Sequence, residues 1–444
     1  MSFPLGAASN ATPISCCRVC GNPALVPILD LGEHSLTGRF PRPDEKDPPS
    51  GPLALVMCDR SAAADGAACG TLQLSHDYEQ SEMFGERYGY RSSVTETMRR
   101  HLHAKAHALV ERAAPAAGDV VLDIGCNDGT LLRCYDGMGL RRIGIDPSSG
   151  PFVGSLPPDI ELVIDFFSAD RVRPLLGGAK LKIVTSIAMF YDLPDPVQFM
   201  REVRALLADD GIWEMEQSYM PLMLSELTYD TICHEHLTYY GLTQIAWMAE
   251  RADLRILDAS TNDVNGGSFR VQLTPRHGPR RPAPESERAI AALLAEEARS
   301  GLDSAAPHLT FAERISHHRD VVRDFFRLAE GKVVLGYGAS TKGNVILQYC
   351  GVTTRELPAI LERYAPKCGL VTPGSRIPII SEDEGRARRP DFLLVFPWHF
   401  RDEIVRREAA FLEAGGHLVF PLPRFEIVGK DGVLQSTALG KTAA

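Results

Sequence analysis

The chain has 444 residues, and at roughly 100–200 residues per domain this length predicts two to four domains. Hydrophobic residues make up 44% of the chain and charged residues 23%, as in ordinary globular enzymes. The formal net charge of -10 argues against a nucleic-acid-binding protein, because neutralising phosphates requires clustered Lys and Arg, but it does not exclude a small anionic ligand.

No run of about 18 apolar residues is present, so we expect no membrane span. Residues 1–15 lack the basic and long apolar segments of a signal peptide, and we therefore expect a cytoplasmic protein. In such a protein the ten cysteines indicate metal ligation before disulfides.

Residues 1–75 are rich in Cys, Gly and Pro, and for them we predict a small zinc-binding module. A CxxC motif is followed by a glycine, which permits the tight turn that lets two thiolates grip one ion. The second cysteine pair is separated by ten residues instead of the usual two, so four unlinked small hydrophobic side chains are the alternative. Four thiolates leave no coordination position open for water, so the ion would be structural. The candidate ligands are Cys17, Cys20, Cys58 and Cys69.

Residues 76–275 alternate helix-like and strand-like segments, which predicts a parallel sheet with helices on both faces. Helical periodicity runs through Met98–Ala113 and Pro196–Leu207. Short apolar runs predict strands at Val120–Ile124, Ile143–Asp146, Leu162–Ile164, Ile183–Ile187 and Gly211–Met215.

The strongest motif follows the first of these strands, which ends in Asp123 before a glycine-rich turn opens a helix. The turn is not GxGxxG, which disfavours a dinucleotide site, but its glycines let the backbone approach a ligand closely. Asp146 ends the next strand, where a carboxylate can accept both hydroxyls of a ribose. This order resembles the class I S-adenosylmethionine (SAM) methyltransferases, and a generic strand–turn–helix is the alternative. The candidate SAM-binding residues are Asp123, Gly125, Asn127, Asp128, Gly129, Asp146, Asp165 and Phe166.

Residues 229–240 gather two histidines, two acids and three tyrosines. Thr238 stands where HExxH would need a histidine, which excludes a zinc protease of that type. Methylation of a carbon beside a carbonyl needs a base for the proton and a donor for the enolate oxygen. A histidine suits the first task, and a tyrosine or a second histidine such as His234 suits the other. The alternative is a polar loop whose histidines are satisfied.

Further polar residues are expected near the ligand-binding edge of this sheet. Glu216 and Tyr219 follow the strand that ends at Met215. Asn265 belongs to a turn rich in Gly and Asn, which either lines the same cleft or is only a β-turn.

A linker and helical connector is expected at residues 276–330, with helical periodicity over about Glu287–Leu328. Residues 331–444 then predict a second α/β domain. Its expected strands are Val333–Gly336, Ala359–Glu362, Phe392–Phe396 and His417–Phe420. The whole chain therefore predicts two doubly wound, Rossmann-like α/β domains with a small N-terminal zinc-binding module.

The loop after the first strand of this second domain offers backbone N–H groups, two hydroxyls and a lysine, which suit a phosphate at a helix N-terminus. Its candidate ligands are Ser340, Lys342 and Asn344. A purely structural tight turn is the alternative.

In combination and order, these motifs resemble the sugar C-methyltransferases, which methylate a carbon of nucleotide-linked keto-deoxysugars. The matching segments are CRVCG at 17–21, YGYRSS at 88–93, LDIGCNDG at 122–129, the His-Glu-His core at 234–236, NGGS at 265–268 and GYGASTKGN at 336–344. The resemblance implies that His236 is the base, that Glu235, Tyr88 and Tyr90 lie in the active site, and that the second domain closes over a nucleotide sugar.

The chain departs from this family pattern at Cys233, where some members carry Tyr, and at the strand end near Ser186, where some carry His. We retain Ser186 as a candidate substrate contact, and the run Asp192-Leu193-Pro194-Asp195-Pro196 looks like a subgroup feature. The particular sugar, nucleotide and carbon stay open, as does the choice between monomer and dimer. The competing functions are an N- or O-methyltransferase, an NAD(P)-dependent oxidoreductase working from the second domain, and a non-catalytic zinc scaffold.

Overall fold

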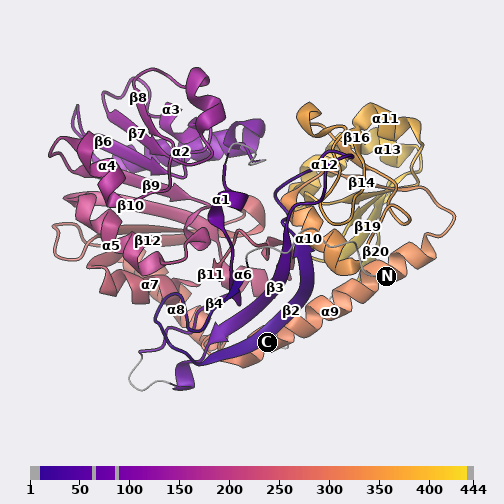
Figure 1. The fold of residues 1–444 in the computed structure, drawn as a ribbon, viewed down its shortest axis with the longest axis horizontal. Coiled ribbons are helices and arrows are strands. Elements are labelled where there is room, and N and C mark those ends of the chain that lie inside the picture. The colour runs from indigo at the N-terminus through magenta and orange to yellow at the C-terminus, as the bar shows by residue number, and fades with distance from the viewer. Residues whose placement is uncertain (1–10, 63–66, 86–89, 438–444) are drawn as a thin grey trace.

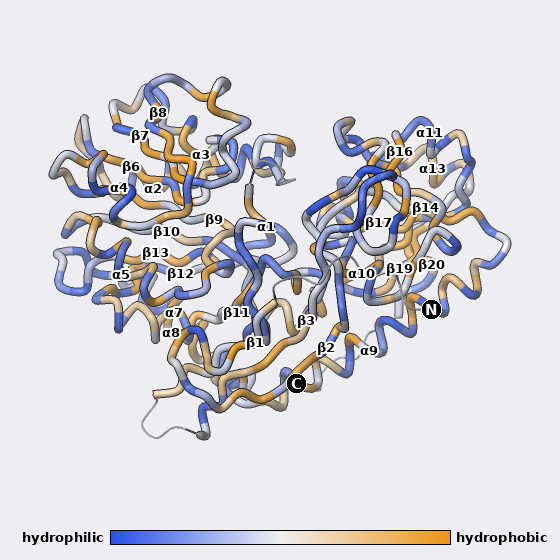
Figure 2. The backbone as a smooth tube through the Cα atoms, in the orientation of Figure 1, coloured by the Kyte–Doolittle hydropathy of each residue, from blue (hydrophilic) through white to orange (hydrophobic). Residues whose placement is uncertain are grey.

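The computed structural model describes residues 11–62, 67–85 and 90–437, which form two seven-stranded sheets with flanking helices and a smaller N-terminal sheet. In Figure 1 the two large sheets lie in separate lobes, and β2 (Leu25–Ser35) and β3 (Ser50–Cys58) run between them beside the long helix α9 (Ala305–Leu328). Figure 2 shows hydrophobic residues along the strands of both lobes, where the cores form. The predicted fold class is confirmed. No helix among the described residues is long and apolar enough to cross a bilayer.

The first large sheet has the strand order β12-β13-β10-β9-β6-β7-β8. The strands from β10 to β8 are parallel, whereas β13 pairs antiparallel with β10 and β12. Their bounds are β6 (Val120–Ile124), β7 (Arg141–Ile145), β8 (Ile160–Val163), β9 (Leu181–Ile187), β10 (Leu207–Ser218), β12 (Leu254–Asn262) and β13 (Ser268–Pro275). All five strands predicted for this region are present, although β10 begins four residues earlier than the predicted Gly211.

Helices cover this sheet, and their starts follow local capping chemistry. The Thr95 side chain accepts a hydrogen bond from the Met98 N–H at the start of α2, and Asp195 caps α5 in the same way before Pro196. The helices are α2 (Glu96–Ala113), α3 (Thr130–Arg133), α4 (Ala169–Leu176), α5 (Pro196–Leu206), α6 (Met220–Ser225) and α7 (Leu242–Arg251). Both predicted helices are therefore confirmed to within two residues at their ends.

The connector contains two helices, α8 (Pro284–Arg299) and α9, where the sequence predicted one helical stretch. The interruption contains Gly301, whose φ of +63° is left-handed and ends a regular helix.

The second large sheet has the order β16-β15-β14-β17-β18-β19-β20, parallel through β18 and antiparallel afterwards. Its strands are β14 (Val334–Tyr337), β15 (Ile360–Glu362), β16 (Ile379–Ser381), β17 (Phe392–Val395), β18 (His417–Phe420), β19 (Phe425–Gly429) and β20 (Gly432–Thr437). Its helices are α10 (Thr341–Cys350), α11 (Glu382–Ala387), α12 (Arg401–Arg407) and α13 (Ala409–Glu413).

The N-terminal sheet joins the two lobes. Its order is β11-β4-β3-β2, and β1 pairs separately with β5. The short strand β11 (Thr238–Tyr239) begins two residues after His236 and pairs antiparallel with β4 (Leu72–Leu74). At the other side, Ser35 at the end of β2 exchanges hydrogen bonds with the Gln348 side chain on α10. The remaining elements here are β1 (Thr12–Pro13), β5 (His76–Asp77) and α1 (Gln80–Met83).

Candidate active site and metal centre

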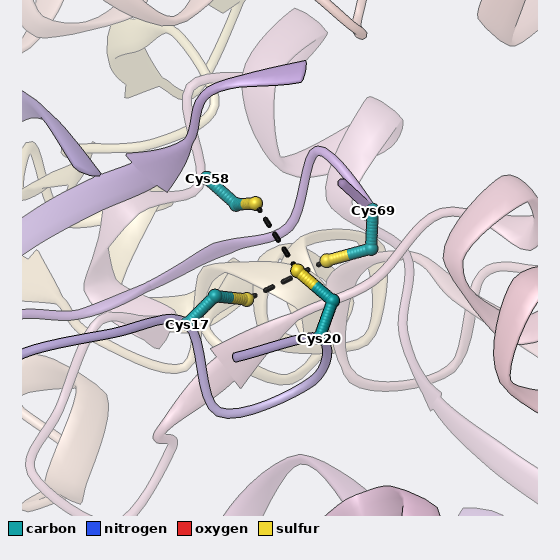
Figure 3. Close-up of side chains that lie close together, drawn as sticks. All are labelled: Cys17, Cys20, Cys58 and Cys69. Atoms are coloured by element: carbon teal, nitrogen blue, oxygen red, sulfur yellow. Dashed lines mark hydrogen bonds between the residues drawn. The ribbon is translucent and has the colours of Figure 1, made fainter. Parts of the chain in front are cut away.

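The four predicted cysteine ligands form one cluster, drawn in Figure 3. Their sulfur atoms all lie within 4.8 Å of one another, and none is in a disulfide. Tetrahedral zinc with bonds of about 2.3 Å to sulfur places neighbouring sulfurs about 3.8 Å apart, so the cluster fits this ion. The four sulfurs fill a tetrahedral shell, and the zinc is therefore structural. Neighbouring Cys16 lies outside the cluster.

The glycine-rich turn after β6 is held in shape by Asp146. Its Oδ2 accepts a hydrogen bond from the Asn127 N–H at 2.8 Å, and its Oδ1 accepts from the Ser148 N–H and hydroxyl at 2.6 Å each. Gly125 has a φ of +75°, and a Cβ added there would lie 3.0 Å from the Met189 side chain. The turn thus needs glycine both for its conformation and for close packing.

Asp123, at the end of β6, adds a second carboxyl group beside this turn. Its side chain accepts a hydrogen bond from the Thr185 hydroxyl at 2.6 Å. Burial, helped by the nearby charge of Asp146 and opposed by the Thr185 hydrogen bond, raises the pKa of Asp123 to about 7. Two acids with no lysine or arginine paired to either, among the described residues, suit a ligand that carries positive charge.

A cavity of about 600 Å³, which we call the central cavity, lies where the N-terminal segment and the two lobes meet. Most of the predicted site residues line it: Tyr90, Asp123, Gly125, Asn127, Asp146, Phe166, Glu216, Glu235, His236, Asn265, Ser340 and Lys342. Segments far apart in the sequence therefore share one chamber. Tyr88 lies outside the described residues.

The other predicted residues lie outside the lining of the central cavity. The Tyr219 hydroxyl donates to Glu297 Oε1 at 2.6 Å, and the Ser186 hydroxyl accepts from Trp213 Nε1 at 2.9 Å. His234 is fully buried, with Nε2 3.3 Å from the Gly51 carbonyl. These side chains are buried and held by partners in the protein interior, away from the cavity lining.

The remaining predicted ligands also lie outside the lining of the central cavity. Asp128 accepts hydrogen bonds from the Thr130 hydroxyl and the Ser93 N–H, and Gly129 only caps α3. Asp165 pairs with Arg171 at 2.9 Å. Asn344 donates to the Thr37 carbonyl at 2.7 Å, because it lies two residues beyond Lys342 on α10 and so faces away from it.

His236 presents one ring nitrogen to the cavity. Its Nδ1 lies 2.6 Å from the Thr231 carbonyl, which can only accept, so Nδ1 carries the proton and Nε2 keeps a free lone pair. The Tyr191 ring packs against it with centroids 4.1 Å apart. Burial, with the charge of Lys342 and against the Thr231 hydrogen bond, lowers the pKa of His236 to about 4. The imidazole is therefore neutral at physiological pH.

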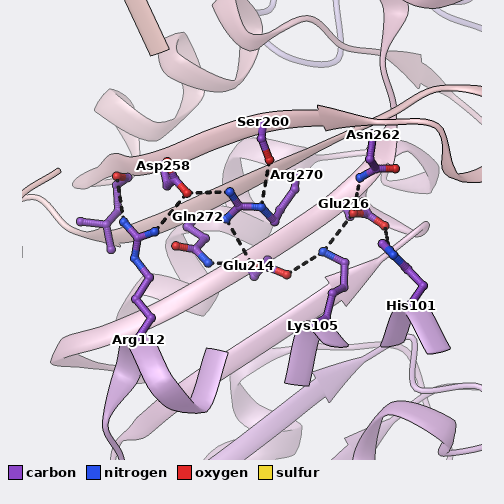
Figure 4. Close-up of polar contacts among 11 residues, drawn as sticks. His101, Lys105, Arg112, Glu214, Glu216, Asp258, Ser260, Asn262, Arg270 and Gln272 are labelled. Atoms are coloured by element: carbon purple, nitrogen blue, oxygen red, sulfur yellow. Dashed lines mark hydrogen bonds and ion pairs between the residues drawn. The ribbon is translucent and has the colours of Figure 1, made fainter. Parts of the chain in front are cut away.

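Glu216 lines the cavity but belongs to a buried ion-pair network, drawn in Figure 4. His101 Nε2 lies 2.6 Å from Glu216 Oε1, and Lys105 Nζ and Asn262 Nδ2 reach Oε2 at 2.9 and 2.7 Å. Burial would raise the pKa of Glu216, but the His101 hydrogen bond and the Lys105 charge outweigh it and lower the pKa. Both carboxylate oxygens are held, so Glu216 stiffens the end of β10.

On the opposite wall, the loop after β14 presents cationic and polar groups. The Ser340 hydroxyl caps α10 by accepting from the Gly343 N–H at 3.0 Å. Lys342 Nζ donates to the Asn265 carbonyl at 2.7 Å, and Lys367 Nζ donates to the Ala339 carbonyl at 2.9 Å. This wall suits an anion.

Four polar residues that line the cavity were not among the predicted site residues: Asp192, Gln217, Lys367 and His399. Asp192 and His399 both stand just after strands of a parallel sheet, a position that could have drawn attention to them. Gln217 follows Glu216 in the segment already expected at this edge, whereas Lys367 carries no comparable signal.

Comparison with known proteins matches the chain to three family models: "Putative zinc binding domain" at 17–84, "Methyltransferase domain" at 98–259 and "C-methyltransferase C-terminal domain" at 263–423. The C-methyltransferase NovU of Streptomyces niveus is 32% identical over 428 residues, which cover 95% of this chain and 99% of NovU. The chain belongs to the sugar C-methyltransferase family. This C-methyltransferase uses SAM as methyl donor and structural zinc, as predicted.

Other relatives match smaller parts of the chain. A ubiquinone biosynthesis O-methyltransferase of Pseudomonas aeruginosa is 27% identical over 106 residues, which cover 23% of this C-methyltransferase and 45% of that enzyme. Among solved structures, a complex between the Haloferax volcanii Trm112 methyltransferase activator and a methyltransferase matches 40% of this chain and 91% of that chain, with 19% identity and a TM-score of 0.32.

Proposed function

We propose that this chain methylates a carbon beside the ketone of a nucleotide-linked keto-sugar, with His236 as the base. The supporting observation is the shared central cavity, in which the acidic turn at Asp123, the His236 imidazole and the cationic wall at Lys342 face one chamber. SAM bound beside the acidic turn would supply an electrophilic methyl group that needs no further activation. Asp123 and Asp146 would hold its positive charge and its ribose.

His236 has the protonation state that a base requires. Its Nε2 lone pair accepts the proton from the carbon beside the ketone, and the electron pair of the broken C–H bond moves into the enolate. The enolate carbon would then take the methyl group of SAM held beside the acidic turn, and the sulfonium would leave as a neutral thioether. The hydrogen bond from Nδ1 to the Thr231 carbonyl fixes the ring orientation and supports the positive charge that His236 gains.

The nucleotide end of the substrate would lie against the second lobe. Lys342 and Lys367 supply positive charge, and the N-terminal turn of α10 supplies backbone N–H groups for a diphosphate. Binding at this wall would place the sugar over His236, so that positioning provides much of the rate enhancement.

The test is a screen of nucleotide-linked keto-sugars deuterated beside the ketone, followed by mass for gain of one methyl and loss of deuterium. We expect His236→Ala to fold and bind SAM but to lose about 10²–10⁴-fold in methyl transfer, the usual contribution of a general base. His234→Gln is the matched control, because His234 faces Gly51 outside the cavity, and its folded fraction should retain methyl transfer.

Two results would contradict the proposal. Near-normal turnover of His236→Ala would remove His236 from the role of base. Methyl gain with full retention of deuterium beside the ketone would indicate transfer to nitrogen or oxygen instead.

A further inference from the structure

A short buried turn, η6 (Tyr229–Thr231), carries the carbonyl group that orients His236. The Thr231 carbonyl accepts the hydrogen bond from His236 Nδ1 at 2.6 Å. The proton position and the ring direction of His236 therefore depend on where this turn places a single oxygen atom.

The side chain of Asp230 joins this turn to the second lobe. Trp398 Nε1 donates a hydrogen bond to Asp230 Oδ2 at 2.7 Å, and Trp398 opens the 3-10 turn η9 (Trp398–Phe400) that follows β17. Both side chains are buried, and neither lines the central cavity, whereas Thr231 does. The hydrogen bond from Trp398 thus acts on the turn and not on a molecule in the cavity.

Tyr229, the first residue of the turn, is fixed as well. Its hydroxyl lies 3.0 Å from His318 Nδ1 on α9, and His318 Nε2 lies 2.7 Å from the Pro421 carbonyl. Since that carbonyl can only accept, His318 Nε2 carries the proton and Nδ1 accepts from the Tyr229 hydroxyl. Burial, against the Pro421 hydrogen bond, lowers the pKa of His318 to about 4, which keeps the ring neutral. Two residues of η6 are therefore anchored by their side chains, and the third presents its carbonyl to His236.

Trp398 also connects the turn with the cationic wall. A Cβ added to Gly266 would lie 2.6 Å from the Trp398 ring, so this glycine of the NGGS segment makes room for the indole. Lys342 Nζ lies 6.0 Å from the centre of the same ring and donates to the carbonyl of neighbouring Asn265. The indole thus links the turn that orients His236 to the wall that carries positive charge.

We propose that Trp398 and Asp230 are positioning residues that align His236 for proton removal. Their hydrogen bond fixes η6, and η6 fixes the Thr231 carbonyl. The carbonyl in turn selects the Nδ1-protonated form of His236, whose Nε2 lone pair is free. Because Trp398 belongs to the second lobe, His236 is aligned only while this lobe is seated against the first. The use of the aligned ring as a base rests on the function proposed above, whereas the alignment itself does not.

Nuclear magnetic resonance of the full zinc-loaded protein with ¹⁵N-labelled histidine tests this alignment at neutral pH without substrate. His236 is recognised by the ring signals that His236→Gln removes, and we expect the unmodified protein to show only its Nδ1-protonated form. The double variant Asp230→Leu with Trp398→Phe removes acceptor and donor together and leaves no unpaired carboxyl group, so it should fold. In this variant we expect a mixture of both neutral forms of His236, and the single variant Trp398→Phe should show the same mixture.

Turnover of the double variant measures what the alignment contributes to the reaction. We expect kcat for methyl transfer to fall by about 10- to 100-fold, the size of loss that follows from misplacing a reacting group by about 1 Å. The SAM dissociation constant should not change, because neither substituted residue lies at the acidic turn.

Two further variants are the matched controls. Asp230→Asn keeps an acceptor oxygen for Trp398, so it should keep the single form of His236. Tyr337→Phe also removes a hydrogen bond from a buried aromatic residue to a buried carboxyl group, Glu408 Oε1 at 3.1 Å, but this bond lies within the second lobe. It should leave the His236 signals unchanged.

A folded double variant that keeps only the Nδ1-protonated form of His236 would overturn the proposal. The same mixture in Tyr337→Phe would also overturn it, because the change would then reflect general loosening of the second lobe. If His236→Ala loses methyl transfer while the double variant keeps a normal kcat, the positioning role is wrong. A mixture in the double variant together with normal turnover of His236→Ala would retain the alignment and reject the function proposed for His236.

Discussion

Two loops of the molecule share one backbone design, and their differences show how the chain separates its two ligands. Each loop joins a buried strand to a helix through a glycine turn, β6 to α3 in the first lobe and β14 to α10 in the second. In each, the acid at the end of the next strand accepts a backbone N–H of the turn. Asp146 Oδ2 accepts from Asn127 at 2.8 Å, and Glu362 Oε2 accepts from Ala339 at 2.9 Å.

The charges around the two turns are opposite. The first turn has Asp123 at the end of its strand and a second acid, Asp146, beside it, whereas the second turn has Lys342 and Lys367 close by. The same strand–turn–helix therefore suits a cationic donor on one wall of the central cavity and an anionic group on the other. The specificity lies in a few charged side chains and not in the fold.

Removing the zinc should change how the two loops are positioned relative to each other, while the conformation of each loop stays intact. The N-terminal sheet pairs with β11 on one side and bonds α10 on the other, so its loss should uncouple the lobes. Structural zinc contributes about 10–16 kcal/mol of folding free energy in zinc-finger peptides, which makes this the largest expected effect. We expect Cys58→Ser to lose bound zinc and methyl transfer, measured by elemental mass spectrometry and turnover, while SAM binding largely persists.

Cys16→Ser is the control for that experiment, because Cys16 adjoins Cys17 but lies outside the cluster. It should keep zinc and turnover. Full methyl transfer by zinc-free protein would show that the sheet does not hold the lobes in register.

The two strand-end acids offer a direct comparison of the loops. Asp146→Asn removes the charge that holds Asn127 and Ser148 and should weaken SAM binding by about 2–3 kcal/mol, roughly 30–150-fold, the cost of losing charged hydrogen bonds. The equivalent change Glu362→Gln should leave the SAM dissociation constant unchanged. Calorimetric titration with SAM measures both, and equal losses in the two variants would contradict the separate assignment of the loops.

Lys342→Met tests the cationic wall in the same way as Asp146→Asn tests the acidic turn. The loss of one charged donor is expected to weaken binding of thymidine diphosphate by about 1.5–2 kcal/mol, roughly 10–30-fold, and to reduce the salt dependence of that binding. SAM affinity should not change. Lys332→Met is the control, because Lys332 is exposed and pairs with Asp391 at the other end of β14. An unchanged diphosphate affinity in Lys342→Met would remove this wall from anion binding.

The strands, the glycine turn and the cysteine cluster could be predicted from the sequence because each depends on a local pattern of residues. The apolar runs predicted β6 and β9, and the glycine turn with its two acids predicted the shape of the turn on which the proposed SAM site depends, since these features need only neighbouring residues. The cysteine ligands were predictable because thiolates in one module have few other roles.

Residues that reach the cavity only through tertiary packing could not be predicted from local patterns. Lys367 reaches the cavity because β15 lies beside β14, and Asp192 reaches it from the turn after β9. Tyr219 follows the end of a strand, as the sequence indicated, but its hydroxyl donates to Glu297 on α8 and its side chain lies outside the cavity lining. No pattern around Glu297 indicates that contact.

The smallest expected effect concerns the protonation of Asp123. Protonation of this carboxyl group near neutral pH should change ligand binding at the acidic loop. A positively charged ligand favours the ionised carboxylate. With a pKa of about 7 in the free protein, Asp123 is ionised above that pH and protonated below it, so SAM affinity should fall as the pH falls through 7. If only the ionised form binds, the loss between pH 8 and pH 6 is at most about tenfold, because one pH unit below the pKa leaves roughly a tenth of the groups ionised.

Calorimetry in buffers of different ionisation enthalpy should detect up to about one proton released per SAM bound near pH 6, since binding drives the ionisation of Asp123. Asp123→Asn should bind more weakly at pH 8 and lose both the proton release and the pH dependence. Asp119→Asn, at a half-buried position just before β6, should keep both. Proton release that persists unchanged in Asp123→Asn would assign the titration to another group and leave Asp146 as the acid that distinguishes the two loops.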